Sequence, residues 1–596
     1  MPGTGTAAFI TSSGATISLG PAAVADTLFV EGPIGGESLL SSGTLSLTSR
    51  AGSQLFINVD APGTILRLYD AGSSPVLVTA SKVTLGADVG KQGNMILDSQ
   101  SGGSVTLSVT DTLTIGYDGS GSYVYTYPFI GNPSGATSIS AGTIEMSVLS
   151  TAGQTDYNYV GTYTAGSTLT ATTMNIGVAG SQGGADNYGG TWTVGTTAIG
   201  FAASAANNYL TITDGGVYTN SAAFTVGVSG TGNQVYVGYA PDAFASTVGM
   251  LSLTGTASDL VIGAASTADA NGVTVDFAGS TLAVVTNVIV GIDGHSNTFV
   301  VDHGAAATSG GARLGVNAGA SGNSATVQNA ATWTMNGTVR VGDKGSGNSF
   351  SILSGGVVTL TGSGKNFFVG YSKSASNNTL TVSGSGSVLD VKASDADLVV
   401  SANLGLGANA TGNVVNVSDG GLLDVNRLLV GSGGSLTGHG GTVNGFTGVA
   451  AGGQIAPGAA GPGSIGTLSF VGDVDLASQG GTYAVDLGPA GAADLIIVSG
   501  SLSIADATLT ISAAPVGSTG FVYEIAKYGA LSGEFGSIVG LGYGWSIDYN
   551  YLSTNTIALI APVPEIEPGS AGSVLAALAG ALGLFERRLR RRPSAG

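Results

Sequence analysis

Apolar and polar residues alternate along this chain in short stretches that are separated by segments rich in glycine and asparagine. The clearest copies start with Asn and end in Asp or Ser followed by Gly-Gly; they lie at residues 208–216, 348–356 and 413–421. Alternation of this kind is typical of a β-strand that buries one face. Ahead of residue 562, no stretch has the periodicity and composition of an amphipathic helix. The pattern therefore predicts an all-β chain.

A second mark, an apolar residue followed by Gly, recurs between Leu85-Gly86 and Val430-Gly431. Its later copies begin at residues 176, 199, 226, 262, 290, 314, 341, 369, 406 and 430. One repeat of about 25 residues cannot bury its apolar face alone, so successive turns must stack at a strand spacing of about 4.8 Å. Gly and Asn adopt the left-handed backbone conformation that corners require, and stacked corner asparagines are expected to form hydrogen-bonded ladders. These features predict a right-handed parallel β-helix, or β-solenoid.

The repeats divide the chain into five parts. We expect an N-terminal β segment or cap (residues 1–80), a β-helix repeat array (81–432), a closing β-helix segment (433–500), a terminal β cap (501–561) and a C-terminal tail (562–596). The first residues contain neither the charged region nor the apolar region of an export leader. We therefore expect that the natural start lies further upstream or that the chain is a fragment.

Two parts of the body resemble known families. Pairs of turns with the extra Gly-Ser-Gly-Ser at residues 384–387 are similar, over residues 80–432, to the repeat of autotransporter passengers and PEP-CTERM proteins. Residues 438–443, 452–458 and 463–468 resemble the closing segment of autotransporter passenger β-helices, in which an Ala-Pro-Gly corner recurs. Both resemblances imply a parallel β-helix. A passenger fragment of an autotransporter is one alternative interpretation of the chain.

The tail has three consecutive parts. Residues 562–568 read Pro-Val-Pro-Glu-Ile-Glu-Pro, residues 570–585 are small and apolar, and an arginine cluster follows. We expect residues 570–585 to form a short transmembrane helix, assisted by bilayer thinning because 16 residues fall short of the ~20 that span a bilayer. Positively charged flanks stay on the cytoplasmic side. The expected membrane-orientation anchor consists of Arg587, Arg588, Arg590, Arg591 and Arg592.

This tripartite tail resembles the PEP-CTERM sorting signal of Gram-negative, exopolysaccharide-producing bacteria. The resemblance implies that an exosortase-type processing enzyme of the inner membrane recognises Pro564, Glu565 and Pro568, although Ile566 and Glu567 interrupt the Pro-Glu-Pro triad. It also implies export, a tether to the inner membrane before processing, and a final location at the cell surface or outside the cell. Extracellular polysaccharide is then an expected partner.

The charge distribution excludes other partners. The formal net charge is −19, the chain has no cysteine, and no Lys or Arg occurs between Lys91 and Arg313. Nucleic acid needs several cationic phosphate contacts, so nucleic-acid binding is excluded. An acidic polysaccharide would be repelled for the same reason. Disulfide bonds and thiolate metal sites are impossible without cysteine.

No catalytic motif stands out, so we expect neither enzymatic activity nor a cofactor or metal. The histidines (His295, His303 and His439) do not have metal-ligand spacing. The alternative is a β-helical, glycan-active enzyme, in which two carboxylates must converge on one groove. The carboxylates considered for that role are Asp390, Asp395 and Asp397 in one group and Asp293 and Asp302 in another. Calcium at turn aspartates such as Asp118 and Asp293 is a weaker alternative.

Tyrosines gather near the predicted turns of the first part of the array. They are Tyr117, Tyr123, Tyr125, Tyr127, Tyr157, Tyr159 and Tyr163. Exposed tyrosines beside amide side chains can stack on neutral sugars, whereas strand aromatics can also simply pack along the solenoid face, which we considered the better interpretation. The sequence as a whole predicts an exported structural or adhesive solenoid without a catalytic site.

Overall fold

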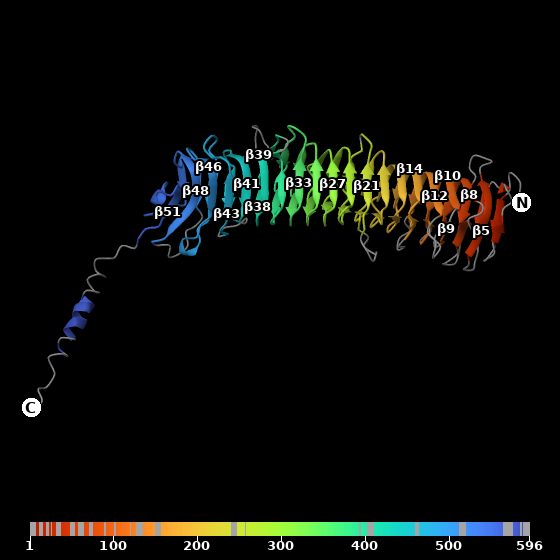
Figure 1. Ribbon diagram of the computed structural model, residues 1–596, viewed down its shortest axis with the longest axis horizontal. Helices are drawn as coiled ribbons and strands as arrows, with labels where there is room; N and C mark the ends of the chain where they lie inside the picture. Colours follow the sequence, from red (N-terminus) through yellow and green to blue (C-terminus); the bar gives the residue numbers. More distant parts are fainter. Residues whose placement is uncertain are drawn as a thin grey trace, which may run out of the picture.

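The computed structural model is an elongated stack of parallel β-strands (Figure 1). It describes the strands between residues 7 and 70, residues 75–563 with gaps, and residues 576–584 and 587. The gaps are residues 89–90, 100–102, 120, 127–134, 150–156, 240–246, 257, 393–394, 402–409, 459–463 and 512–519. The parallel β-solenoid expected from the repeats is present, and its right-handed sense stays a prediction.

Each turn of the repeat array contributes one strand to a series that we call sheet B. Successive strands pair in parallel and in register. They are β9 (Asn94–Ser99), β11 (Tyr123–Thr126), β13 (Tyr159–Thr162), β15 (Gly184–Tyr188), β17 (Tyr209–Thr213), β20 (Gln234–Val237), β23 (Gly272–Val275), β26 (Thr298–Val301), β29 (Ser324–Gln328), β32 (Ser349–Leu353), β35 (Thr379–Ser383) and β38 (Asn413–Ser418).

The rest of each turn belongs to sheet A, as one long strand or as two strands joined at a bend. The long strands are β10 (Ser104–Ile115), β12 (Ala136–Met146), β14 (Thr168–Ile176), β16 (Thr191–Ile199) and β39 (Leu422–Val430). The two-strand turns are β18 (Val217–Asn220) with β19 (Phe224–Val226), β21 (Met250–Leu253) with β22 (Leu260–Ile262), β24 (Thr281–Val284) with β25 (Asn287–Val290), β27 (Ala306–Ser309) with β28 (Gly311–Leu314), β30 (Thr332–Met335) with β31 (Val339–Val341), β33 (Val357–Leu360) with β34 (Phe367–Val369), and β36 (Val388–Asp390) with β37 (Asp397–Val400).

Further strands continue the stack at both ends. Towards the N-terminus they are β1 (Ala7–Ile10), β2 (Thr16–Ser18), β3 (Ala23–Val24), β4 (Thr27–Val30), β5 (Glu37–Leu47), β6 (Gln54–Ile57), β7 (Ile65–Asp70) and β8 (Val76–Leu85). After the array they are β40 (Gly434–Gly438), β41 (Gly441–Val449), β42 (Gln454–Pro457), β43 (Thr467–Val471), β44 (Val474–Asp475), β45 (Thr482–Val485), β46 (Leu495–Ser503), β47 (Thr508–Ile511), β48 (Val522–Ser532), β49 (Ser537–Val539), β50 (Ser546–Asp548) and β51 (Thr556–Ile560). The last strand, β51, runs antiparallel to β48 and to β50, so the parallel stack ends there.

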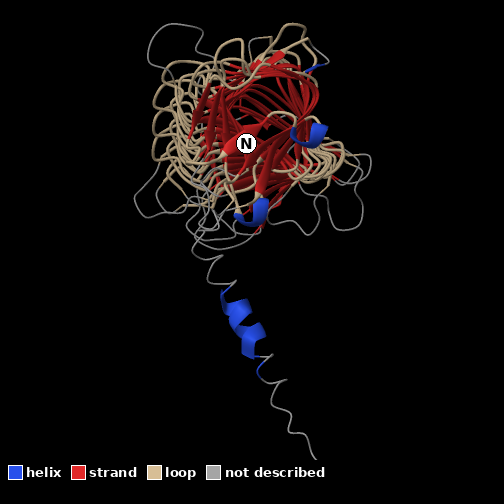
Figure 2. Cartoon of the chain, turned by 90° about the vertical axis from the view of Figure 1, so that its left-hand side faces the viewer, coloured by secondary structure: helices blue, strands red, loops and turns tan. Residues whose placement is uncertain are grey.

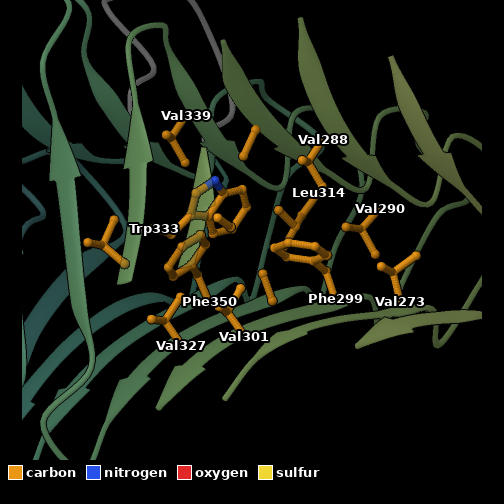
Figure 3. Close-up of a cluster of buried hydrophobic side chains, with 14 of the residues drawn as sticks. Val273, Val288, Val290, Phe299, Val301, Leu314, Val327, Trp333, Val339 and Phe350 are labelled. Carbon is orange, nitrogen blue, oxygen red and sulfur yellow. The ribbon is translucent and has the colours of Figure 1, made fainter. Parts of the chain in front are cut away.

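The interior is filled by every second residue of each strand. In sheet B, Val273, Phe299, Ala325 and Phe350 occupy one register position on successive strands, and all four are fully buried. Large and small side chains alternate at this position, so the aromatic rings fill the interior without overlap. Figure 3 shows Phe299, Trp333 and Phe350 packed together, and the Trp333 and Phe350 ring centroids lie 5.5 Å apart. The Trp333 indole N–H, buried with the ring, donates to Ser309 Oγ at 3.0 Å.

A ladder of asparagines lines the corner before sheet B. The N–H and the Nδ2 of Asn271 both donate to Oδ1 of Asn297, at 3.0 and 3.1 Å, and Asn297 donates in the same way to Asn323. The uninterrupted ladder contains Asn208, Asn233, Asn271, Asn297, Asn323, Asn348, Asn378 and Asn413, each at most 1% exposed. The predicted corner ladders are therefore confirmed. Figure 2 views the molecule from one end, with the strands around the interior and the loops outside them.

The apolar residues of the steps from Ile176-Gly177 to Val369-Gly370 end strands of sheet A, and the glycines of these steps face this ladder. Gly342 has φ +73°, and a Cβ at that position would lie 2.2 Å from Nδ2 of Asn378. Two separate reasons thus require glycine, since other residues are strained at positive φ and a methyl group would overlap the ladder amide. The apolar-Gly step and the asparagine that precedes the strand of sheet B therefore form the two sides of one corner.

The expected transmembrane helix over residues 570–585 is wrong. The helix that the structure describes in this region covers residues 576–584, beyond β51 (Figure 1). Nine helical residues extend only about 14 Å, against the ~30 Å of a bilayer core. Of the residues that the structure describes, none belongs to a helix with the length and apolar character needed to cross a membrane. Gly580 and Gly583 lie within the described helix, and glycine disfavours helical conformation.

Candidate functional site

The most distinctive surface of the described chain lies on the outer face of sheet B between β11 and β20. One register position carries Tyr123, Tyr159, Gly184 and Tyr209 on successive strands. A second position, two residues further along each strand, carries Tyr125, Gly161, Asp186, Thr211 and Tyr236. Residues two apart on a strand share a face, so these side chains form one outward surface that crosses five turns. We call it the tyrosine surface.

The rings of the tyrosine surface pack against one another. Tyr123 and Tyr125 stack with centroids 4.5 Å apart, and Tyr163 and Tyr188 stack at 5.1 Å. Tyr125 meets Tyr163 edge to face at 5.3 Å. Mutual packing of this kind fixes the orientation of the rings and leaves them as a continuous platform rather than as separate flexible side chains.

Two glycines make space for the rings. A Cβ on Gly161 would lie 2.6 Å from the Tyr163 ring, and a Cβ on Gly184 would lie 2.5 Å from the Tyr209 ring. The φ angles of these glycines are not positive, so the close approach of the rings, rather than the backbone conformation, is what excludes a side chain there. The first residue of β15 is therefore glycine because the neighbouring tyrosine ring occupies the space of a side chain.

Asp186 lies among the rings and is only 6% exposed. The Tyr163 hydroxyl donates to Asp186 Oδ2 at 3.3 Å. Burial, and after it the negative charge of Asp186, raises the pKa of Tyr125, Tyr163 and Tyr209 above the usual tyrosine value. These phenols therefore keep their protons at any physiological pH and remain hydrogen-bond donors.

A hollow of about 620 Å³ opens over the tyrosine surface. Its lining combines aromatic rings, one carboxylate and amide or hydroxyl groups, and no described lining residue is basic. The lining residues are Tyr125, Tyr159, Tyr163, Asp186, Tyr188, Asn207, Asn208, Tyr209, Thr211, Gly232, Gln234 and Tyr236. Such a site can stack against the flat face of a ligand and exchange hydrogen bonds with its polar groups.

The sequence analysis found part of this surface. It named Tyr123, Tyr125, Tyr159 and Tyr163, which the structure brings together; Tyr117 and Tyr157 instead lie exposed at turns, and Tyr127 is outside the described residues. It missed Asp186, Tyr188, Tyr209 and Tyr236. Alignment of the repeats on their corner asparagines would have found one of them, since Tyr159 and Tyr209 each follow such an asparagine directly.

The carboxylates considered for catalysis are tied to other groups. Asp397 accepts a hydrogen bond from Nε of Arg427 at 3.0 Å. Asp302 accepts from Gln328 and Asn329, and Asp293 accepts from Asn317 at 2.8 Å. Asp390 stands beside Asp424 on the next strand, and Lys392 lies 3.5 Å from Asp424. Asp395 has a positive φ of 53° in the turn before β37.

Metal ligands do not gather in the described residues, among which no three His, Cys, Asp or Glu side chains form a group able to hold an ion. His303 lies on the surface with its Nδ1 2.8 Å from Asp276. That hydrogen bond, together with the charges of Asp302 and Asp276, raises the pKa of His303 above its ordinary value. His295 contacts Ser321 at 3.1 Å, which is an ordinary turn contact.

The predicted sorting residues Pro564, Glu565 and Pro568 lie outside the described residues, as do Arg588, Arg590, Arg591 and Arg592. Arg587 is described, exposed and in helical conformation. The structure therefore leaves the sorting signal and the arginine anchor as predictions.

No protein-family model matches the chain, and no curated protein matches it at a significant level.

Proposed function

We propose that this chain is an exported structural or adhesive component of a bacterial cell surface or extracellular matrix. The observation that supports the proposal is the uninterrupted stack of parallel turns, joined through the corner ladder from Asn208 to Asn413. In a solenoid each turn contacts only its neighbours, so length and lateral surface grow with every repeat. A long, regular rod of this kind suits a role in spanning distance and in presenting a repeated surface.

The C-terminal tail would direct this rod to its destination. In this proposal an exosortase-type enzyme at the inner membrane recognises Pro564, Glu565 and Pro568 and removes the segment that follows. The basic cluster would contact the anionic inner-membrane surface before processing. It consists of Arg587, Arg588, Arg590, Arg591 and Arg592. Extracellular polysaccharide is the proposed partner of the released solenoid.

Mass spectrometry of the C-terminus tests this proposal on protein recovered from the cells and medium of the organism that makes it. A terminus between Pro564 and Pro568 in the surface or medium fraction is the expected result. The double variant Pro564→Ala with Pro568→Ala should keep the intact tail, whereas Pro593→Ala, in the same tail but outside the motif, should be processed normally. An intact chain confined to the cytosol would overturn the proposal.

A further inference from the structure

We propose that the tyrosine surface binds a neutral polysaccharide, whose sugar rings stack on the tyrosine platform and whose chain runs along the solenoid axis. The inference rests on the adhesive role proposed above and gives it a ligand class and a location. It is carried by the geometry between β11 and β20 and by the charge of that part of the chain.

The platform offers the two kinds of contact that a sugar needs. The apolar face of a pyranose ring stacks on an aromatic face, and its hydroxyl groups require donors and acceptors at the edge. Tyr163 and Tyr188 are nearly parallel in their stack, with an interplanar angle of 12°. Asn207, which is exposed, and Gln234, which is half-buried, supply amide oxygen and nitrogen atoms in the same hollow.

Charge selects a neutral ligand. The hollow contains one carboxylate, and no Lys or Arg occurs in the sequence between Lys91 and Arg313. An anionic polysaccharide would therefore meet repulsion without any compensating cation. A cationic ligand is the less favoured occupant, because Asp186 is only 6% exposed and its carboxylate already accepts a hydrogen bond from the Tyr163 hydroxyl.

Stacked ring pairs also argue against a cation. A cation site places the ion over ring faces that converge from several sides. Here Tyr123 with Tyr125 and Tyr163 with Tyr188 have turned faces towards each other, at interplanar angles of 18° and 12°. Each of these rings has one face covered by its partner, so the opposite ring faces, the ring edges and the protonated phenol groups are what can meet a hydroxyl-rich ligand.

The platform is confined to one part of the rod. The register position that carries Tyr123, Tyr159 and Tyr209 continues along sheet B as Gln234, Gly272, Thr298, Ser324, Ser349 and Thr379. These turns stack with polar side chains or glycine at this position, so stacking between neighbouring turns does not require the tyrosines. Their concentration over five turns indicates a binding surface. This surface runs along the axis, because residues at one register position follow one another at the strand spacing of about 4.8 Å.

Affinity gel electrophoresis of the purified full chain tests the inference, with gels that contain dextran, galactomannan or xyloglucan as neutral probes. Alginate serves as the anionic comparator and chitosan as the cationic one. We expect retardation by at least one neutral polysaccharide, an unchanged affinity in 0.5 M NaCl, and no retardation by alginate. Retardation by chitosan alone would replace the inference with a cation site, and retardation by none of the probes would overturn it.

Variants locate the binding on the protein. Tyr163→Ala and Tyr209→Ala should each weaken binding by about tenfold or more, and Asp186→Asn should weaken it less. Tyr371→Ala is the matched control, because Tyr371 is 38% exposed and packs on Phe368 away from the platform. Unchanged binding in both tyrosine variants would overturn the inference.

Two readouts keep the result interpretable. Circular dichroism melting identifies a variant that fails to fold, and Tyr209→Phe then retains the ring while removing only the hydroxyl group. Binding by the purified chain does not depend on export. A chain that binds neutral glycan but stays in the cytosol would contradict the proposed function alone, whereas a surface chain without glycan binding would contradict only this inference.

Discussion

The corners of the repeat array and the corner of the closing segment meet the same need with different side chains. In the array, the N–H of Asn271 donates to the amide oxygen of Asn297, one turn further along. In the closing segment, the N–H of Gly466 donates to the carboxylate of Asp494, also one turn further along, at 2.7 Å. In both places the bend leaves a backbone N–H without a partner in the sheet, and a side-chain oxygen of the neighbouring turn accepts its hydrogen bond.

The two corners differ in the hydrogen bonds that the accepting side chain can still make to the following turn. The amide of Asn297 accepts with Oδ1 and donates with Nδ2, so the pattern continues to Asn323 and beyond. An ionised carboxylate only accepts, and the second oxygen of Asp494 takes the N–H of Asp486 at 2.9 Å. A ladder of amides can therefore extend over any number of turns without charge, whereas an ionised Asp cannot donate to the next turn and carries a group that titrates.

The largest effect that follows from this comparison should come from a methyl group placed against the ladder. Gly342→Ala would bring Cβ to 2.2 Å from the Asn378 amide at positive φ, so the amide must move and the Asn348 donors lose their acceptor. We expect the free energy of unfolding to fall by roughly 5 kcal/mol, from left-handed strain and two unsatisfied donors together. Guanidinium denaturation followed by circular dichroism measures it.

The matched control is Gly347, which lies in the same connection between β31 and β32 as Gly342. Gly347 has φ +68°, but a Cβ there meets no atom within 4 Å. Gly347→Ala should therefore lower the free energy of unfolding only by the cost of left-handed backbone strain, about 1 kcal/mol. Equal losses in the two variants would show that backbone conformation alone explains the recurrence of glycine in the apolar-Gly steps, and would remove the ladder from the explanation.

A somewhat smaller loss is expected when one ladder member is removed. Asn297→Ala leaves the N–H and Nδ2 of Asn271 without their acceptor in a fully buried corner. Two unsatisfied buried donors should lower the free energy of unfolding by about 3 kcal/mol. Asn336→Ala, at an exposed asparagine of the same array, should change it by less than about 0.5 kcal/mol. If the two variants have equal stability, the ladder does not stabilise the fold.

The sequence was sufficient for the array because every feature of the array is local and repeated. Alternation predicts the strands, and the recurrence of Asn208, Asn348 and Asn413 in one context indicates a ladder. The prediction for the tail was wrong: composition alone indicated a transmembrane helix over residues 570–585, whereas the helix that the structure describes covers residues 576–584 and is too short to cross a bilayer.

The tyrosine surface could be predicted only in part, because it depends on register between turns of unequal length. Tyr123, Tyr159 and Tyr209 are separated by 36 and 50 residues, and a turn carrying Gly184 stands between the last two. Nothing in the local pattern around Asp186 shows that it lies among these rings. The same variation hid the role of Asp494, which a single sequence presents as an ordinary acidic residue at the start of a strand.

The smallest predicted effect concerns the pH dependence of the Asp494 corner. Burial raises the pKa of Asp494 to about 7 from 3.8, even though the N–H groups of Asp486 and Gly466 partly oppose that shift. Between pH 4 and pH 7 the folded chain therefore holds a proton that the unfolded chain has released, so this group's contribution to stability grows as the pH falls from 8 and is lost as it rises through 7. Between pH 8 and pH 6 the free energy of unfolding should rise by about 1.4 kcal/mol from this group.

Asp494→Asn separates this contribution from those of other groups. The amide does not titrate, so the difference in unfolding free energy between the original chain and the variant should change by about 1.4 kcal/mol between pH 8 and pH 6. Asn297→Ala, which alters a neutral corner, should keep the same difference from the original chain at both pH values. A pH-independent difference for Asp494→Asn would mean that the carboxylate stays ionised throughout. In that case its two backbone hydrogen bonds outweigh the cost of burial, and the closing corner differs from the ladder only in its inability to continue.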